Sequence, residues 1–181
     1  SVPAKIIETE LEIGREKADD GRILWYNSAC LLDPSGKLTA THYKVHLAPV
    51  GEWFPYAKWF PSLKKYIDSM GGSDFTPGDG VSLMKAGSFS FGTAVCYESI
   101  FPEINRKYAS LGADFAVVIT NDGWSTSYQG HYHHFAPSVF RAVENGIWYV
   151  TSGNTGKTAL INPFGVITAE MPILEKGFLN A

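Results

Sequence analysis

Strand and helix patterns alternate through the second half of the chain, and this alternation restricts the possible folds more than any other feature. The strand patterns cover 89–96, 115–120, 147–151 and 158–161, and the helical patterns cover 99–111 and 131–145. A chain that places helices between successive buried strands forms an α/β fold, with the helices packed on a sheet.

The first half of the chain has a different pattern, a succession of strands. From Ile7 to Ile13 apolar residues and threonine alternate with glutamates, which is the two-residue period of a strand with one solvated face. Further strand patterns cover 25–32, 38–43 and 81–84, and the first two are separated by a turn at 33–36. Together the two halves predict an α/β sandwich of sheets flanked by helices.

The region from 53 to 80 follows neither pattern. It is rich in proline and in aromatic residues, and its only helical pattern is short, at 62–70. The aromatic residues that stand out are Trp53, Phe54, Tyr56, Trp59, Phe60 and Phe75. An irregular segment of this length inside a compact domain is often functional. Two interpretations stay open: a surface excursion that tucks its aromatic rings into the core, or an exposed apolar flap.

The composition is that of a globular protein, and it narrows the classes of partner. Of the 181 residues, 45% are hydrophobic and 18% are charged, and the formal net charge is −3. This charge gives no electrostatic reason to expect a nucleic-acid partner. Two cysteines are too few for a disulfide framework. No apolar run reaches the length of a membrane span, so we expect the chain as written to be soluble. Its abrupt start at Ser1 suggests a piece of a larger protein.

Cys96 is the candidate nucleophile. It ends an apolar strand pattern, and a helical pattern follows almost at once. The N-terminus of a helix favours negative charge, and therefore the thiolate, and its free N–H groups can bind a developing oxyanion. An arbitrary cysteine at such a place is more often a buried core residue. Cys30, inside a strand pattern, fits that structural interpretation, and we expect it to be inert.

Two other polar segments follow strand patterns and give Cys96 possible partners. Lys44 follows the strand at 38–43, in a loop that contains Pro49 and Gly51. The segment Asn121–Trp124 follows the strand at 115–120. Reacting groups of α/β proteins gather in loops at strand ends. Each segment alone is weak evidence, because a lone lysine is usually a solvated charge and Asn-Asp-Gly is usually a turn.

Three other motifs do not support a function. The segment 153–158 imitates a phosphate-binding loop, but Thr151 occupies the place of its first glycine and a strand pattern follows. His131, His133 and His134 lack a convincing carboxylate or cysteine partner for a metal, so we expect no metal site and place them at the start of a helix near the site. The sequence contains no Gly-x-Ser-x-Gly elbow, which argues against a serine hydrolase.

In this order, the segments resemble the nitrilase superfamily, whose members use a cysteine, a lysine and a glutamate on a four-layer αββα fold. The resemblance runs from about Tyr26 to Glu170. It rests on Tyr26–Ala29 with Asp33–Gly36, on Lys44 and Cys96 as the family lysine and nucleophile, and on Arg141–Asn145 followed by Thr155 and Gly156. It implies a nitrilase-like αββα sandwich, truncated at both ends, that fills residues 1–181 as a partial catalytic domain with an aromatic flap at about 53–80.

Within the superfamily, three features resemble the bacterial apolipoprotein N-acyltransferases more than soluble amidases. They are the run 46–53, the aromatic stretch that ends at 75–78, and the pair of motifs at 95–98 and 121–124. The resemblance implies transfer of a fatty acyl group from a phospholipid, through a cysteine thioester, to the N-terminal amine of a diacylglyceryl-cysteine lipoprotein. It also implies a full-length protein at the bacterial inner membrane, with this domain facing the periplasm at the membrane surface, and no cofactor.

The resemblance also implies roles for individual residues. Cys96 is the expected nucleophile, and the Lys44 ammonium lies beside the oxyanion with help from the Tyr97 N–H. Glu52 orients Lys44 or the base. The pocket for the acyl chain is expected to involve the following residues: Glu98, Asn121 and Trp124, with Tyr97 beside them.

The glutamate base of the family has no evident counterpart in the sequence. It belongs on a strand well before Tyr26, whereas Glu8, Glu10 and Glu12 read as a solvated strand face. We therefore expect the base to lie outside this chain and the chain alone to be inactive. Two rival interpretations stay open. One is a soluble carbon–nitrogen hydrolase, of the amidase or N-carbamoylase type, with water as acceptor. The other is a non-catalytic remnant that binds a lipid or lipoprotein.

Overall fold

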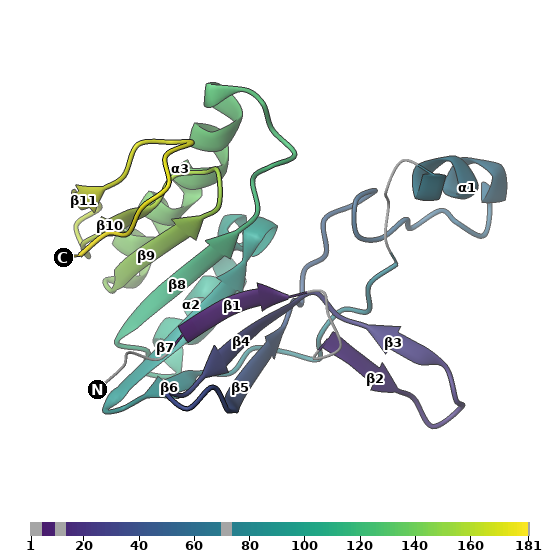
Figure 1. Ribbon diagram of the computed structural model, residues 1–181, viewed down its shortest axis with the longest axis horizontal. Coiled ribbons are helices and arrows are strands. Elements are labelled where there is room, and N and C mark those ends of the chain that lie inside the picture. Colours follow the sequence, from purple (N-terminus) through teal and green to yellow (C-terminus); the bar gives the residue numbers. More distant parts are fainter. Residues whose placement is uncertain (1–4, 10–13, 70–73, 181) are drawn as a thin grey trace.

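A six-stranded sheet forms the centre of the protein in a computed structural model that describes residues 5–9, 14–69 and 74–180 (Figure 1). The strand order is β11-β10-β9-β8-β7-β6, and β7, β8 and β9 are parallel to one another. The other neighbours pair antiparallel. The strands are β6 (Met84–Ala86), β7 (Phe89–Val95), β8 (Phe115–Thr120), β9 (Trp148–Gly153), β10 (Ala159–Ile161) and β11 (Ile167–Glu170).

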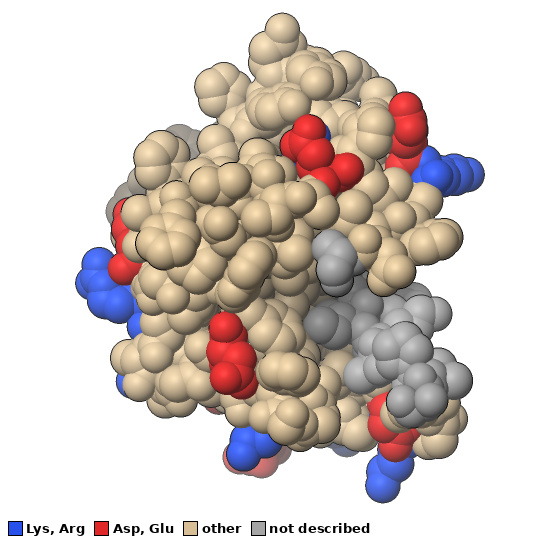
Figure 2. All heavy atoms as spheres, turned by 90° about the vertical axis from the view of Figure 1, so that its left-hand side faces the viewer, with Lys and Arg blue, Asp and Glu red and all other residues tan. Residues whose placement is uncertain are grey.

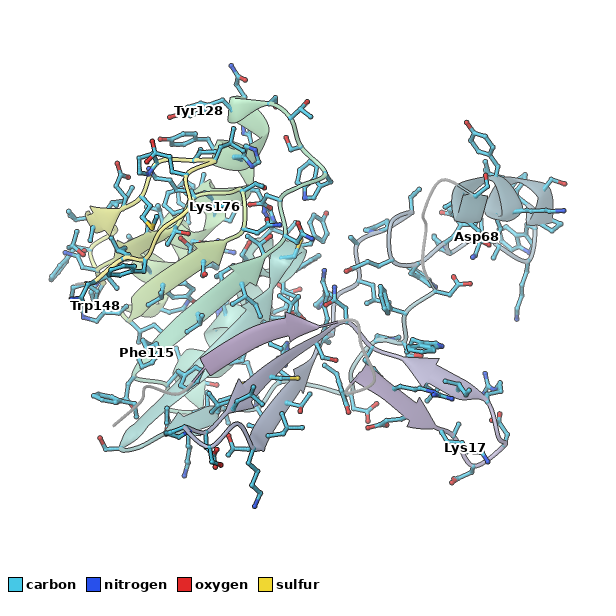
Figure 3. All side chains as sticks on the ribbon, viewed as in Figure 1. Lys17, Asp68, Phe115, Tyr128, Trp148 and Lys176 are labelled. Atoms are coloured by element: carbon cyan, nitrogen blue, oxygen red, sulfur yellow. The ribbon has the colours of Figure 1, made fainter. Side chains whose placement is uncertain are left out.

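A smaller antiparallel sheet and a separate hairpin come from the first half of the chain. The sheet has the order β1-β4-β5, with β1 (Lys5–Thr9), β4 (Ser28–Leu32) and β5 (Leu38–Tyr43). The hairpin pairs β2 (Arg15–Lys17) with β3 (Ile23–Trp25). It projects from the body, and Lys17 lies near its tip (Figure 3).

Two hydrophobic clusters join the layers on either side of the large sheet. On one face, α2 (Pro102–Ser110) and α3 (Tyr128–Asn145) pack on the strands. Their cluster is formed by Ala94, Ile104, Tyr108, Ala113, Ala116, Val118, Phe135, Ala142, Tyr149, Ala159 and Ile161. On the other face, Ala29 and Leu31 of β4 pack on Phe91, Val95 and Val117. The order of helices, large sheet and small sheet confirms the predicted α/β sandwich of sheets flanked by helices.

The aromatic region projects from this body as an arm. It carries α1 (Pro61–Ser69), which Figures 1 and 3 show well away from the sheets, with Asp68 on it. Phe54 is buried, but most of the other aromatic side chains are exposed, and Trp59 reaches 75%. The exposed set is Trp53, Tyr56, Trp59, Phe60 and Tyr66. Among the described residues of the arm, most aromatic rings are therefore not part of the core.

The observed elements differ from the predicted ones mainly at their ends. The predicted strand at 25–32 is two strands, β3 and β4, in different sheets. The predicted helix at 99–111 is a 3₁₀ helix, η2 (Cys96–Ile100), followed by α2. Pro102 separates them because proline suits only the first turn of a helix. The predicted strand at 81–84 lies instead at β6, and β11 was not predicted. Residues 10–13 of the predicted first strand lie outside the described residues.

The helix α3 begins one turn earlier than its predicted start at His131. Its N-cap is Ser127, whose side chain accepts a hydrogen bond from the Gly130 N–H. It ends at Gly146, which has a φ of 66°, the left-handed conformation that glycine adopts without strain.

Charged side chains are scattered over the surface. On the face shown in Figure 2, which is the left-hand side of Figure 1, acidic and basic side chains lie in small groups of mixed sign near the edge, and most of the face carries neither. In the part of the chain that the structure describes, no helix has the length and apolar character needed to cross a lipid bilayer.

Gly92 in β7 allows α2 to approach the sheet closely. A Cβ atom at this position would lie 2.1 Å from Cγ of Tyr108, a fully buried ring whose hydroxyl donates to the Thr93 carbonyl at 2.6 Å. We therefore expect Gly92→Ala to lower the free energy of unfolding by about 1–3 kcal/mol through overpacking. Gly80→Ala, at a glycine with open space around it, is the matched control. Equal denaturant midpoints for the two variants would contradict the expectation.

Candidate functional site

Cys96 lies at a strained turn at the carboxyl end of β7. Its φ is 53°, in the left-handed region that residues other than glycine rarely adopt, and η2 begins at the same residue. The residues of β7 from Phe91 to Val95 are buried, whereas Cys96 is partly exposed and carries a free thiol. Strained backbone of this kind clusters at functional sites. The predicted strand-to-helix turn therefore exists and leaves the thiol accessible.

Cys30 is in a different environment. It lies in β4 with no exposed surface, and burial raises the pKa of its thiol. A thiol that is kept protonated inside a core is a poor nucleophile. The two cysteines therefore differ in the way that the sequence predicts.

Glu98 joins the Cys96 turn to the loop that follows β5. Its carboxylate is fully buried and accepts the Val95 N–H at 2.8 Å and the Val45 N–H at 2.6 Å. Oε2 also lies 3.0 Å from Nε2 of His42. Burial by itself would raise the pKa of Glu98, but the hydrogen bond and charge of His42, with the backbone donors, hold this pKa below its usual value.

The position of Glu98 differs from the one predicted. The sequence places Glu98 in the acyl pocket, whereas in the structure its side chain is fully buried between two loops. One carboxylate binds the residue before Cys96 and the residue after Lys44. The structure therefore brings together the segments that carry the predicted nucleophile and the predicted lysine, and Glu98 is the connection between them.

Lys44 is fully buried and is held by Glu52. Its Nζ donates to Oε1 of Glu52 at 2.9 Å and lies 2.8 Å from Oε2. Glu52 also accepts hydrogen bonds from Asn27 Nδ2 at 2.7 Å and from the Ala48 N–H at 2.6 Å. The Glu52 carboxylate thus has four contacts, two from Lys44 Nζ and one each from Asn27 and Ala48. These contacts hold the Lys44 ammonium in place. The predicted partnership of Glu52 and Lys44 is present as a contact.

The other predicted site residues lie around the turn with different surroundings. Tyr97 packs its ring edge-on against Phe101, with 5.3 Å between the centroids. Asn121 is exposed, and its Oδ1 accepts from Asn154 Nδ2 at 2.6 Å. Trp124 is 66% exposed, and its ring lies edge-on to that of His134 at 6.1 Å. Tyr97 follows Cys96 directly in the chain. Trp124 lies against the ring of His134, and His134 in turn lies next to Cys96.

His134 and Asp122 also belong to this site, although the sequence did not identify them. His134 Nε2 lies 3.9 Å from Cys96 Sγ, and His134 Nδ1 lies 2.7 Å from Asp122 Oδ1. The signal in the sequence was a histidine near the start of a helix and an aspartate directly after a strand. From the sequence, we rejected the three histidines as metal ligands and placed them at the start of a helix near the site, without predicting a contact with Cys96.

The three histidines of α3 have three different environments. His131 is buried, and neither ring nitrogen has a hydrogen-bond partner among the described residues, whereas His133 is exposed. Only His134 reaches Cys96. Within residues 5–9, 14–69 and 74–180, no group of three or more histidine, cysteine or acidic residues is arranged to hold a metal ion.

Comparisons with known proteins identify relatives of two kinds. The model of the Carbon-nitrogen hydrolase family matches residues 6–181. The apolipoprotein N-acyltransferase of Geobacter metallireducens is 39% identical over 162 residues, which is 90% of this chain and 31% of the relative. The apolipoprotein N-acyltransferase of Brucella suis is 34% identical over 167 residues, which is 91% of this chain and 31% of the relative. The chain thus spans 31% of the length of each of these relatives.

A solved structure shares the fold. It is a variant of the amidase from Nesterenkonia sp. AN1, with the acetamide moiety of fluoroacetamide added covalently at its active-site cysteine. It superposes with a TM-score of 0.63 at 24% identity and covers 85% of this chain and 53% of the amidase. Because the family match extends over nearly the whole chain and the sandwich has the same architecture, this chain belongs to the carbon–nitrogen hydrolase family, the nitrilase superfamily.

Proposed function

We propose that this chain is the catalytic part of an N-acyltransferase that moves a fatty acyl group from a phospholipid to the N-terminal amine of a diacylglyceryl-cysteine lipoprotein. The observation that carries the proposal is the similarity to apolipoprotein N-acyltransferases over nine tenths of the chain, with Cys96 partly exposed at a strained turn. The likeness to amidase structures supports the fold, and the identity to the acyltransferases is higher.

The proposed chemistry has two steps. In the first, the Cys96 thiolate attacks the ester carbonyl of the phospholipid, the C–O bond breaks, and the leaving lysophospholipid takes up the proton that the thiol has given up. In the second, the lipoprotein amine attacks the thioester, an amide forms, the amine loses a proton, and the thiol is released. Both steps pass through a tetrahedral oxyanion, which we assign to the Lys44 ammonium and the Tyr97 N–H.

In this proposal the contacts around Lys44 serve to hold its charge in place. A donor that is already oriented toward the oxyanion needs no reorganisation during the reaction. Glu52 provides that orientation through its contacts with Lys44, Asn27 and Ala48. Glu98 is then a positioning residue, because it holds the Lys44 loop against the Cys96 turn.

The exposed aromatic arm fits a lipid substrate. Trp59, Phe60 and Tyr66 are more than half exposed, and rings of this kind settle at the interface between lipid and water. We propose that the arm contacts the membrane surface and covers the acyl donor. The substrates place the enzyme at the bacterial inner membrane, with this domain on the periplasmic side. Trp124, which is exposed beside His134, is the proposed wall of the acyl pocket on the sheet side.

A fluorescent phospholipid tests the proposal on the full-length protein. Incubation is expected to leave a fluorescent acyl group on Cys96, which hydroxylamine removes and peptide mapping locates. Cys96→Ala is expected to lose this label, and Cys30→Ala is the matched control that keeps it, because Cys30 is buried. Labelling that persists in Cys96→Ala would refute the thioester.

The same experiment separates the acyltransferase from a hydrolase. Addition of a diacylglyceryl-cysteine peptide to the labelled protein is expected to move the fluorescence into the peptide as an amide. A carbon–nitrogen hydrolase would instead release free fatty acid at the same rate with or without the peptide. A binding protein without catalytic activity would retain lipid without forming a covalent bond.

A further inference from the structure

His134 connects the candidate nucleophile to a buried carboxylate. Its Nε2 lies 3.9 Å from Cys96 Sγ, and its Nδ1 lies 2.7 Å from Asp122 Oδ1. The three residues come from different elements: Cys96 follows β7, Asp122 follows β8, and His134 lies in α3. A sulfur, an imidazole and a carboxylate in sequence form an arrangement that activates thiols elsewhere in protein chemistry.

Asp122 is fixed more firmly than a turn residue needs to be. Its Oδ1 accepts from Thr120 Oγ1 at 2.9 Å, and its N–H donates to Asn154 Oδ1 at 3.0 Å. The backbone of Gly156 closes the other side, because a Cβ there would lie 1.8 Å from Asp122 Oδ2. The Asp122 side chain is 3% exposed and the His134 side chain is 9% exposed. The carboxylate therefore sets both the position and the orientation of the ring.

The charges in this cluster are complementary. Burial disfavours a charged ring, but the hydrogen bonds that the ring makes to Asp122 and Cys96, together with their negative charges, raise the pKa of His134 to about 10. Burial also opposes ionisation of Asp122, and the bond to His134 holds the pKa of Asp122 below its usual value. Two other titratable groups face the pair: His131 lowers the pKa of Asp122 further, and Lys157 lines the same small cavity.

We propose that His134, held by Asp122, is the charge partner that keeps Cys96 as a thiolate in the resting protein. The proton of Sγ rests on Nε2, so that a thiolate and an imidazolium replace a thiol and an imidazole with no change in net charge. The inference rests on the proposed function in one respect, the identity of Cys96 as the nucleophile. His134 is then a catalytic residue, because it touches the reacting sulfur, and Asp122 is a positioning residue.

The proposal gives the lysine and the histidine separate tasks. The Lys44 ammonium is bound by both carboxylate oxygens of Glu52. Its charge is available to an oxyanion, while the charge of His134 is directed at the sulfur. The thiolate therefore exists before the acyl donor arrives. The proton of the thiol is then already on His134 when the first attack begins.

The pH dependence of Cys96 alkylation in the full-length protein tests the proposal. Iodoacetamide reacts with the thiolate only, and peptide mapping separates Cys96 from Cys30. In His134→Gln the alkylation rate near pH 6 is expected to fall by about tenfold or more, while the rates converge at about pH 10, well above the ordinary thiol pKa of about 8.5. The midpoint of the profile thus moves to higher pH. His133→Gln, at the exposed neighbouring histidine, is the matched control and should keep the wild-type profile.

A second pair of variants keeps the test informative if His134→Gln does not fold. Gly156→Ala pushes on Asp122 without touching either reacting residue and is expected to move the midpoint in the same direction by a smaller amount. Gly80→Ala, at an open glycine, is its control. A purely structural role for His134 predicts a different result, which is the same fractional change of rate at every pH with an unchanged midpoint. That result would overturn the proposal.

The outcome is independent of acyl transfer, because alkylation needs neither lipid nor lipoprotein. A shifted midpoint without any thioester labelling would support the ion pair and refute the proposed function. Thioester labelling with equal midpoints in wild type and His134→Gln would support the proposed function and refute the ion pair.

Discussion

Lys44→Met is expected to reduce acyl transfer by about 10²–10³-fold, because it removes the cation assigned to the oxyanion and leaves the rest of the site in place. Methionine fills a similar volume, so the fully buried position is not left empty. The same variant is expected to lose about 3 kcal/mol of stability, since it leaves the Glu52 carboxylate largely buried without its cation. Asn27 and Ala48 still donate to this carboxylate, which places the cost at the lower end of the usual range.

A double variant separates the catalytic part of this effect from the structural part. In Lys44→Met/Glu52→Gln the unpaired charge is gone, and the glutamine oxygen can still accept from the Ala48 N–H. Much of the lost stability is therefore expected to return while acyl transfer stays low. Thermal unfolding and the rate of peptide acylation measure the two effects on the same preparations. Lys37→Met, at an exposed lysine, is the control. Recovery of activity together with stability would show that Lys44 acts only through folding.

Glu98→Ala is expected to lower the free energy of unfolding by about 3–5 kcal/mol, because it leaves the partners of a fully buried carboxylate unsatisfied. These partners are the N–H groups of Val45 and Val95 and the His42 ring. Acyl transfer is expected to fall as well, since the Lys44 loop loses its link to the Cys96 turn. Glu103→Ala, at an exposed glutamate of α2, is the control. A loss below about 1 kcal/mol, as is usual for surface changes, would contradict the connecting role of Glu98.

The pH dependence of stability gives the same residue a second test. Burial alone would raise the pKa of Glu98, but the hydrogen bond and charge of His42 outweigh it and hold this pKa in the folded protein below the usual value of a glutamate. A depressed folded pKa means that the unfolded chain binds the proton more readily. The stabilising contribution is therefore fully present above about pH 4.5 and is lost as the pH falls through the folded pKa. Glu98→Gln is expected to flatten the decline of stability in acid relative to the wild type, as measured by denaturant titration at several pH values.

Local patterns in the sequence predicted the main elements of the large sheet and its helices. The strands at 89–96 and 115–120 and the helix ending at Gly146 were recognisable because apolar periodicity and a C-terminal glycine depend only on near neighbours in the chain. The same reasoning failed where the partner of a segment decides its structure. Residues 25–32 have one continuous strand pattern, yet they divide between two sheets because β3 pairs with β2 and β4 pairs with β1 and β5.

The candidate site was predicted only in part for the same reason. Cys96 and Lys44 were recognisable because each follows a strand and matches a family motif. Glu98 was assigned to a pocket, since nothing in its neighbourhood reveals that its carboxylate accepts N–H groups from a loop more than fifty residues away. Asp122 and His134 were not paired, because their contact depends on how α3 packs across the end of β8.

By itself, the sequence determined the class of fold, the family, and the thiol that is presented at the end of a strand, because these follow from short-range patterns and from the order of motifs. Only the tertiary structure decided which partner each buried carboxylate binds. Glu52 binds Lys44, Glu98 binds the two loops together, and Asp122 binds His134. The physical reason is that a buried charged group needs hydrogen-bond partners. Tertiary packing determines which groups lie close enough to be those partners, and this does not depend on their separation along the chain.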